Sequence, residues 1–211
     1  MATINFRVVD LYHNDQVTSF SQAAAAGIWG VIHKATTGAT GVDDAYASRR
    51  QTALDAGLLW GAYHWGTAAD VEQQVDHFLA VAAPQPDTLV ALDYEETAGN
   101  QMTLDQARQF LTLLEEKLGR RAVLYSGGLI KGQLGSTPDA FFGAHRLWLA
   151  QYSSKPVVQA SWKTYWLWQY TDSKTGLEPN QIAGIPGDTS GNLDCNSYSG
   201  TREQLAAEWA S

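Results

Sequence analysis

The feature that most constrains the fold is a regular alternation of strand-like and helix-like segments through the first half of the chain. Short runs rich in β-branched and aromatic residues are each followed by a longer segment with helical periodicity. Alternation of this kind is typical of α/β folds built around a parallel sheet. The predicted strands are residues 6–10, 28–36, 58–65 and 89–96, and the predicted helices are 19–27, 43–57, 70–83 and 103–119.

The second half of the chain carries strands without comparable helices between them. Residues 121–126, 146–152 and 165–171 are predicted strands, 192–196 is a candidate eighth strand, and 201–210 is a closing helix. The pattern predicts an α/β fold, an irregular TIM-like (β/α) barrel of about eight strands with helices reduced in the C-terminal half. A doubly wound open sheet is the structural alternative. It requires a glycine-rich first turn, whereas the first strand continues into "VVDLYHND".

Length and composition narrow the class of protein. A chain of 211 residues is expected to form one domain, 1–211. The net charge of −8 and the absence of a basic run argue against a nucleic-acid partner. The longest apolar run, residues 23–32, is too short and too rich in Gly and Ala to span a bilayer, so we expect no membrane insertion. The N-terminus lacks a basic region followed by an apolar stretch, so no signal peptide is visible.

Cysteine and aromatic usage gives two further expectations. Cys195 is the only cysteine, so an internal disulfide is excluded, and it is expected to be a buried apolar filler. No Cys/His cluster has zinc spacing, so we expect no metal and no cofactor. Eight Trp and nine Tyr suit a protein that holds sugar rings, although aromatic residues more commonly pack the core.

Polar and aromatic side chains stand at the ends of nearly all the predicted strands. In a (β/α) barrel the carboxyl ends of the strands surround the active site, so these side chains are expected to converge on one cleft. They are Asp10, Lys34, Thr36, His64, Asp93, Glu95, Tyr125, Gln151, Tyr152, Gln169, Asp194 and Asn196.

Four of these residues are acids, and together they suggest a reaction. Clustered carboxylates disfavour one another's ionisation, so at least one of Asp10, Asp93, Glu95 and Asp194 should hold a proton near neutral pH. A protonated carboxyl beside an ionised one is what cleavage of a glycosidic bond needs. On a strand Asp93 and Glu95 would point to the same side with Cα atoms roughly 6.5–7 Å apart. That distance does not separate retaining from inverting chemistry.

The motifs, taken in order, resemble glycoside hydrolase family 25, the Chalaropsis-type lysozymes, which are N-acetylmuramidases. The resemblance covers nearly the whole chain and rests on seven stretches: "VVDLYHND", "KATTG…D…AGLLWGAYHW", "ALDYE", "AVLYS", "LWLAQY", "WLWQYT" and "LDCNSYSG". It implies an irregular α/β barrel that hydrolyses the β-1,4 bond between N-acetylmuramic acid and N-acetylglucosamine of bacterial peptidoglycan. A monomer is expected, consisting of one catalytic domain without a separate cell-wall-binding domain.

The resemblance also implies residue roles. Glu95 would be the proton donor, and Asp93 would stabilise charge or orient the substrate's own N-acetyl group. Asp10 and Asp194 would be supporting acids. The candidates for substrate binding are Tyr63, His64, Tyr125, Gln151, Tyr152, Trp168, Gln169 and Asn196. The protein would act on the cell wall, remaining cytoplasmic until its release if it is a phage endolysin.

Two departures and two alternatives accompany the resemblance. Thr37 replaces the acid of the family's K-A-T-E-G pattern, and Leu11 with Tyr12 replaces the usual small residue after the first motif. A chitin-type hydrolase is one alternative, but its longer D-x-x-D-x-D-x-E series is absent from "DTLVALDYE". A non-catalytic glycan-binding barrel is the other, and it would require Asp93 or Glu95 to be replaced or misplaced.

Overall fold

The computed structural model describes residues 4–172, 174–191 and 193–211 and has nine strands and seven helices within them. The strands are β1 Phe6–Leu11, β2 Gly30–Thr37, β3 Gly41–Val42, β4 Leu59–Trp65, β5 Leu89–Asp93, β6 Val123–Ser126, β7 Leu147–Ala150, β8 Leu167–Asp172 and β9 Asp194–Ser197. The helices are α1 Phe20–Ala25, α2 Tyr46–Asp55, α3 Val71–Ala82, α4 Leu104–Leu118, α5 Gly128–Leu134, α6 Ala140–Gly143 and α7 Arg202–Glu208.

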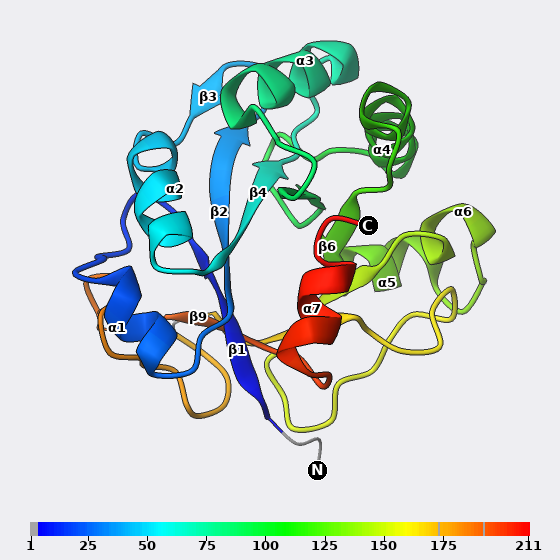
Figure 1. The fold of residues 1–211 in the computed structure, drawn as a ribbon. Coiled ribbons are helices and arrows are strands. Elements are labelled where there is room, and N and C mark those ends of the chain that lie inside the picture. Colours follow the sequence, from blue (N-terminus) through cyan, green and yellow to red (C-terminus); the bar gives the residue numbers. More distant parts are fainter. Residues whose placement is uncertain (1–3, 173, 192) are drawn as a thin grey trace.

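Eight strands close into a barrel, as predicted. The order of pairing is β1-β9-β8-β7-β6-β5-β4-β2, and β1 pairs with β2 to complete the ring. The two-residue β3 pairs only with β2 and lies outside the ring. Helices α1 to α4 pack outside the first half of the barrel, and three of them have 10 to 15 residues, whereas α5 and α6 in the second half have seven and four (Figure 1). The predicted loss of helical cover in the C-terminal half is confirmed.

The expectation that all barrel strands are parallel is wrong for the last one. β9 is antiparallel to both of its neighbours, β8 and β1. Parallel neighbours need a crossover connection, usually a helix, and the described residues between β8 and β9 contain none. The predicted strand 192–196 corresponds to β9, although its first residue, Asn192, lies outside the described residues.

Strand alternation divides the core into two layers. One apolar cluster fills the barrel and includes Val8, Ile32 and Val123, while their sequence neighbours Val9, Val31 and Leu124 belong to the layer between barrel and helices. Cys195 is fully buried in this outer layer, which confirms its expected role as a filler.

The closing helix α7 plugs the barrel at the amino ends of the parallel strands. Leu205 and Trp209 belong to the same cluster as the barrel interior. The Trp209 indole lies so close to Gly30, the first residue of β2, that a Cβ there would be 2.7 Å from the ring. Its Nε1 donates to the Trp60 carbonyl at 2.8 Å. One end of the barrel is therefore sealed, and the opposite end can hold a site.

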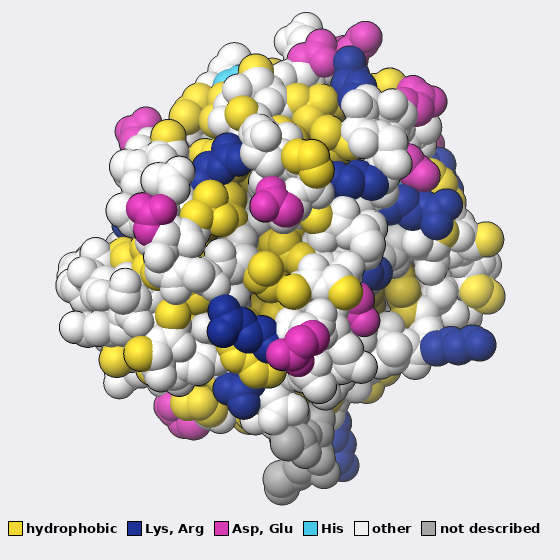
Figure 2. Space-filling view, in the orientation of Figure 1, with side chains coloured by type: hydrophobic (Ala, Val, Ile, Leu, Met, Phe, Trp, Pro, Cys, Tyr) yellow, Lys and Arg dark blue, Asp and Glu magenta, His cyan; other side chains and the backbone are white. Residues whose placement is uncertain are grey.

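The surface face in view carries charges of both signs. Figure 2 shows acidic and basic side chains interspersed on one face. No helix among the described residues is long and apolar enough to cross a membrane.

Candidate active site

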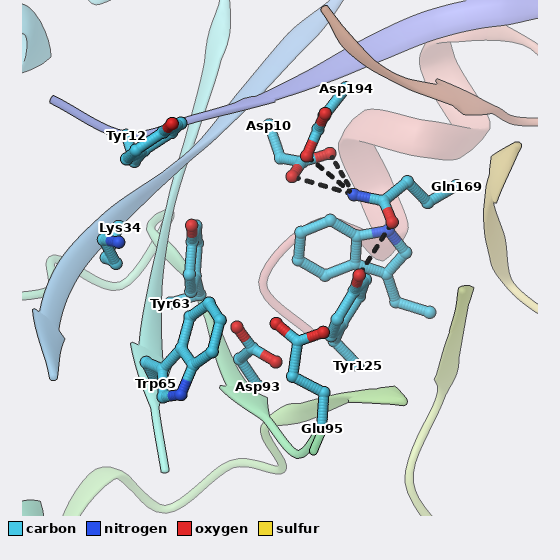
Figure 3. Close-up of a pocket in the computed structure, with 11 residues that line it drawn as sticks. Asp10, Tyr12, Lys34, Tyr63, Trp65, Asp93, Glu95, Tyr125, Gln169 and Asp194 are labelled. Atoms are coloured by element: carbon cyan, nitrogen blue, oxygen red, sulfur yellow. Dashed lines mark hydrogen bonds between the residues drawn. The ribbon is translucent and has the colours of Figure 1, made fainter. Parts of the chain in front are cut away.

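A cavity of about 310 Å³ opens at the carboxyl ends of the parallel strands (Figure 3). This size is at the lower end of the roughly 300–1,000 Å³ of typical small-molecule sites. It lies at the end of the barrel opposite to α7, which is where (β/α) barrels carry their active sites. Its lining combines acids with aromatic side chains: Asp10, Tyr12, Lys34, Tyr63, Trp65, Asp93, Glu95, Tyr125, Trp148, Gln169 and Asp194.

Asp93 and Glu95 both face this cavity, as predicted, but only Asp93 lies on a strand. β5 ends at Asp93, and Glu95 belongs to the following loop. Gln101 holds the loop, because its Nε2 donates to the Glu95 carbonyl at 3.1 Å and its Oε1 accepts from Thr97 N at 2.8 Å. Tyr94 turns the other way and is fully buried in the outer layer. In Figure 3 the two carboxyl groups point toward each other.

The electrostatics of this pair favour protonation. Burial raises the pKa of Asp93 well above its ordinary value, and the nearby charges of Glu95 and Asp10 add to the rise. Burial also raises the pKa of Glu95 to about 7, although a hydrogen bond with Asp93 and the positive charge of Lys34 oppose the rise. Asp93 Oδ1 is buried and has no hydrogen-bond partner among the described residues. The pair can thus hold one proton between two carboxyls near neutral pH.

Asp10 and Asp194 face each other on neighbouring strands. Asp10 is only 6% exposed, and burial raises its pKa to about 6. Burial and the charge of Asp10 raise the pKa of Asp194 well above its ordinary value. Asp194 is the first residue of β9 rather than near its end, and it reaches the site because that strand runs antiparallel. No group of three or more His, Cys, Asp or Glu within the described residues could hold a metal ion.

Two amides connect these acids to the barrel wall. Gln169 Nε2 donates to Asp10 Oδ1 and Oδ2 at 3.0 and 3.1 Å, and lies 3.4 Å from Asp194 Oδ2. Asn196 Nδ2 donates to Asp10 Oδ2 at 2.7 Å. Both residues were predicted to bind substrate, but Gln169 lines the cavity and Asn196 does not.

Two predicted substrate-binding residues lie on the wrong face of their strands. His64 is fully buried outside the barrel, where it contacts Thr36 Oγ1 at 2.7 Å and stacks on Phe110. Trp168 is also fully buried in the outer layer, and its Nε1 donates to the Gln151 carbonyl. Side chains on a strand alternate between faces. Because Tyr63 and Gln169 face the cavity, their immediate neighbours must face away.

Gln151 and Tyr152 lie beside the cavity without lining it. Gln151 organises the loop that follows β7: its Oε1 accepts from Lys131 Nζ and Val157 N, and its Nε2 donates to Ser153 Oγ. Gln151 therefore does not line this cavity, and its role as a substrate ligand stays a prediction. The Tyr152 hydroxyl donates to Gln169 Oε1 at 2.9 Å. Tyr152 therefore contacts a residue that lines the cavity but does not line the cavity itself.

Sequence reasoning missed three lining residues: Tyr12, Trp65 and Trp148. Lys34 was expected in the cleft, and it lines the cavity, although no role was assigned to it. Its Nζ lies 4.7 Å from the centre of the Tyr12 ring and 5.4 Å from that of Trp65. Trp65 follows Tyr63 by two positions, so counting in steps of two from Tyr63 would have found it. Thr37 is exposed and does not line the cavity.

Comparison with known proteins agrees with this geometry. The model of "Glycosyl hydrolases family 25" matches residues 9–177. Over 198 residues the chain is 30% identical to the autolytic lysozyme of Clostridium acetobutylicum, covering 90% of this chain and 55% of that protein. It is 25% identical over 214 residues to lysozyme M1 of Streptomyces globisporus, covering 94% and 69%. The chain thus spans about half of the clostridial protein and two thirds of the streptomycete one.

The fold has a counterpart among solved structures. The crystal structure of a bacterial lysozyme from Streptomyces coelicolor superposes with a TM-score of 0.84 at 22% identity, covering 99% of both chains. The family match spans most of the barrel strands and includes three of the four acids of the cavity. On these grounds the chain belongs to glycosyl hydrolase family 25.

Proposed function

We propose that the protein is a lysozyme, an N-acetylmuramidase that hydrolyses the β-1,4 bond between N-acetylmuramic acid and N-acetylglucosamine in bacterial peptidoglycan. The observation that carries the proposal is the pair formed by buried Asp93 and half-buried Glu95, whose carboxyl groups point toward each other in an aromatic-lined cavity (Figure 3). Glycosidic cleavage needs a protonated carboxyl and negative charge close to the same bond. The names of the two relatives, autolytic lysozyme and lysozyme M1, support the same activity.

Glu95 is the proton donor in this proposal. A pKa of about 7 leaves a substantial fraction of its carboxyl protonated at neutral pH, which an ordinary glutamate would not achieve. The proton passes to the glycosidic oxygen as the bond from that oxygen to C1 breaks. The ionised Glu95 then takes a proton from the water that attacks C1 in the second step, and this restores the starting state.

Asp93 assists through the substrate's own acetamido group. Its unpartnered Oδ1 can accept a hydrogen bond from the acetamido N–H, which aims the acetamido carbonyl oxygen at C1. That oxygen forms a bond to C1 as the glycosidic bond breaks, and the resulting cyclic cation is opened by water. In this step the proton of the pair lies on Glu95 and Asp93 is ionised, a form that burial disfavours and the positive charge of Lys34 favours. The route passes twice through inversion at C1, so the product should retain its configuration.

The remaining lining residues bind and tune. Tyr12, Tyr63, Trp65 and Tyr125 offer apolar ring surface and polar tips, a combination that suits the faces and hydroxyls of sugars. Asp10 and Asp194 act as supporting acids, and the charge of Asp10 raises the pKa of Asp93.

The unit of function in this proposal is a single catalytic domain over 1–211 that works as a monomer. The packing of α7 inside the barrel formed by the earlier strands supports one cooperative unit. The site of action is the bacterial cell wall, reached after release from the cytoplasm if the protein is an endolysin. A solved endolysin structure, that of CTP1L, shares the fold with a TM-score of 0.73.

Mass spectrometry of digested peptidoglycan tests the proposal. Purified sacculi are incubated with the protein, with Glu95→Gln as the inactive control, and the soluble products are reduced and sequenced. Products with reducing-end N-acetylmuramic acid are expected. Reducing-end N-acetylglucosamine would instead indicate hydrolysis of the other linkage, and undigested glycan that still retains the protein would indicate a binding module. Either result would overturn the muramidase assignment.

A further inference from the structure

Two carboxamides occupy the interior of the barrel directly beneath the acids. Gln169 is 1% exposed and Asn196 is fully buried. Each contacts Asp10 through its nitrogen and an aromatic donor through its oxygen. A carboxamide donates only through nitrogen and accepts only through oxygen. The direction in which each amide points therefore determines what Asp10 receives.

The orientation of Asn196 follows from an indole. Trp148 Nε1 lies 2.6 Å from Asn196 Oδ1, and an indole nitrogen can only donate. The amide oxygen must therefore face Trp148, and Nδ2 must face Asp10 Oδ2 at 2.7 Å and the Val8 carbonyl at 3.3 Å. Turning the amide over would bring its oxygen against two acceptors. Asn196 is thus a fixed donor to Asp10.

The orientation of Gln169 follows from two phenols. The hydroxyls of Tyr125 and Tyr152 lie 2.7 and 2.9 Å from Gln169 Oε1 (Figure 3 shows the first contact). With both hydroxyls donating to this oxygen, Nε2 is directed at the two oxygens of Asp10. A hydroxyl can also accept, so these contacts alone would tolerate a flipped amide. The flip would place Oε1 against Asp10, which is favourable only when Asp10 is protonated.

Asp10 and Asp194 differ sharply in the donors they receive. Both oxygens of Asp10 accept amide N–H groups at 2.7–3.1 Å. Within the described residues the Asp194 carboxyl receives one long contact of 3.4 Å, again from Gln169 Nε2. Hydrogen bonds to the charged form of a carboxyl favour that form. The bonds from Asn196 and Gln169 oppose the burial that raises the pKa of Asp10.

We propose that Gln169 and Asn196 are positioning residues that hold Asp10 as the ionised acid of the cavity and leave the proton of the Asp10–Asp194 pair on Asp194. Trp148, Tyr125 and Tyr152 set the direction of the two amides. The fixed negative charge of Asp10 then keeps a proton on the Asp93–Glu95 pair. The link to catalysis rests on the proposed lysozyme activity, whereas the ionisation order of the acids does not.

The other titratable groups around Asp10 include four acids, whose negative charges disfavour ionisation of Asp10. The acids near it or near Asp194 are Asp15, Asp93, Glu95 and Asp172, the neutral titratable groups are Tyr63, Tyr125, Tyr152 and Cys195, and the cation in the cavity lining is Lys34. The surrounding acids all disfavour a charge on Asp10. The amide donors are therefore what distinguishes Asp10 from its neighbours.

Carboxyl titration by ¹³C NMR on the free protein tests the ionisation order. The Asp10 signal is assigned with Asp10→Asn, and its midpoint is expected near pH 6, below that of Asp194. Trp148→Phe keeps a ring but removes the indole donor that fixes Asn196, and Tyr152→Phe removes one donor to Gln169. Each is expected to raise the Asp10 midpoint by about half to one pH unit. The matched control is Trp166→Phe, which removes an indole donor to Glu208 Oε2 near α7.

Two outcomes would overturn the proposal. One is Asp194 ionising before Asp10 in the wild-type protein, and the other is an Asp10 midpoint in Trp148→Phe equal to that in Trp166→Phe. Since this titration uses no substrate, its result is independent of whether peptidoglycan is cleaved. In the pH profile of kcat/KM, the acid limb should move up with the Asp10 midpoint while the alkaline limb, set by the Glu95 proton, stays in place. A purely structural role would lower activity at all pH values instead.

Discussion

The two ends of the barrel are built on the same strands but on opposite principles. At the amino end, Trp209 and Leu205 of the α7 region fill the interior and leave no room for a side chain at Gly30. At the carboxyl end, the same interior ends in four acids around a cavity. The amino end excludes water by close packing. The carboxyl end buries ionisable side chains around a cavity.

The difference separates stability from chemistry. Burying an apolar side chain the size of Trp209 stabilises the folded state by about 2–3 kcal/mol or more. Burying a carboxyl destabilises its charged form, which is why the pKa values of Asp10 and Glu95 rise to about 6 and about 7. Packing at the apolar end therefore stabilises the folded state and offsets the destabilisation caused by the buried acids at the other end. Variants at the two ends should then have opposite effects on stability and activity.

Glu95→Gln should produce the largest effect, a loss of activity without a loss of stability. The substitution removes the proton donor but retains the shape of the side chain, so kcat should fall by about 10²–10⁴-fold. The melting temperature at pH 7 should be equal or higher, because the neutral amide avoids the cost of a buried charge. Turbidity clearing of peptidoglycan and thermal unfolding measure the two quantities.

Glu96→Gln is the matched control, because Glu96 is the exposed neighbour of Glu95. Its rate and its melting temperature should both stay close to the wild-type values. A wild-type rate for Glu95→Gln would show that the acid chemistry resides elsewhere in the cavity.

Trp209→Ala should affect the opposite end in the opposite way. Removing a buried indole from a packed interior costs about 3–5 kcal/mol of the free energy of unfolding. Activity well below the melting temperature should remain, since Trp209 is not among the residues that line the cavity. Denaturant unfolding and kcat/KM at low temperature measure the two effects.

Two further variants sharpen this test. Trp209→Phe should recover part of the stability by refilling the space beside Gly30, and Val157→Ala should leave stability unchanged because Val157 is 61% exposed. Loss of activity at a temperature where Trp209→Ala is fully folded would mean that the two ends are coupled.

The sequence predicted where the barrel strands lie along the chain and which end of the barrel carries the acids. Period-2 and period-3.6 patterns are local, and they are strong where each strand is followed by its own helix. Asp93 is the clearest case, because it ends a fully buried apolar run. In any barrel that contains this strand, Asp93 lies at the carboxyl end of the barrel, because it is the last residue of the strand.

Strand direction and facing were harder to predict because they depend on distant contacts. The reversal of β9 goes with its pairing to both β1 and β8 and with a preceding connection whose described residues hold no helix. The facing of His64 is set by the register of β4, in which Trp65 pairs with Asp93 and turns inward. Trp168 and Gln169 could each line a sugar-binding cleft, one by ring stacking and the other by hydrogen bonds, so the local sequence does not show which one faces inward.

Replacement of His64 tests this corrected placement at the outer wall of the acidic end. Burial lowers the pKa of His64 to about 4, so the ring is neutral, accepts from Thr36 Oγ1 and donates to Gln74 Oε1. His64→Phe leaves the Thr36 hydroxyl without its acceptor and removes one of the donors to Gln74 Oε1, which still accepts from Thr67 N, and it should cost about 1–3 kcal/mol of stability. The value of kcat/KM at 25 °C should change by less than about twofold. A large loss of kcat/KM in a folded variant would return His64 to the site.

Asp194→Asn should give the smallest effect and the most direct measure of what the acidic end costs. Its folded-state pKa lies well above the ordinary value, so the folded protein binds more protons than the unfolded chain between that ordinary value and the raised one. The wild-type protein therefore loses stability relative to the Asn variant as pH rises through this window. At pH 4 the two should be nearly equal, and at pH 7 the variant should be more stable by about 1 kcal/mol. Urea unfolding at both pH values measures the difference.

Asp44→Asn, at an exposed position, removes the same charge and serves as the control. If both variants shift equally between pH 4 and pH 7, the gain reflects net charge rather than relief of a buried carboxyl, and the acidic end is not destabilised by its function.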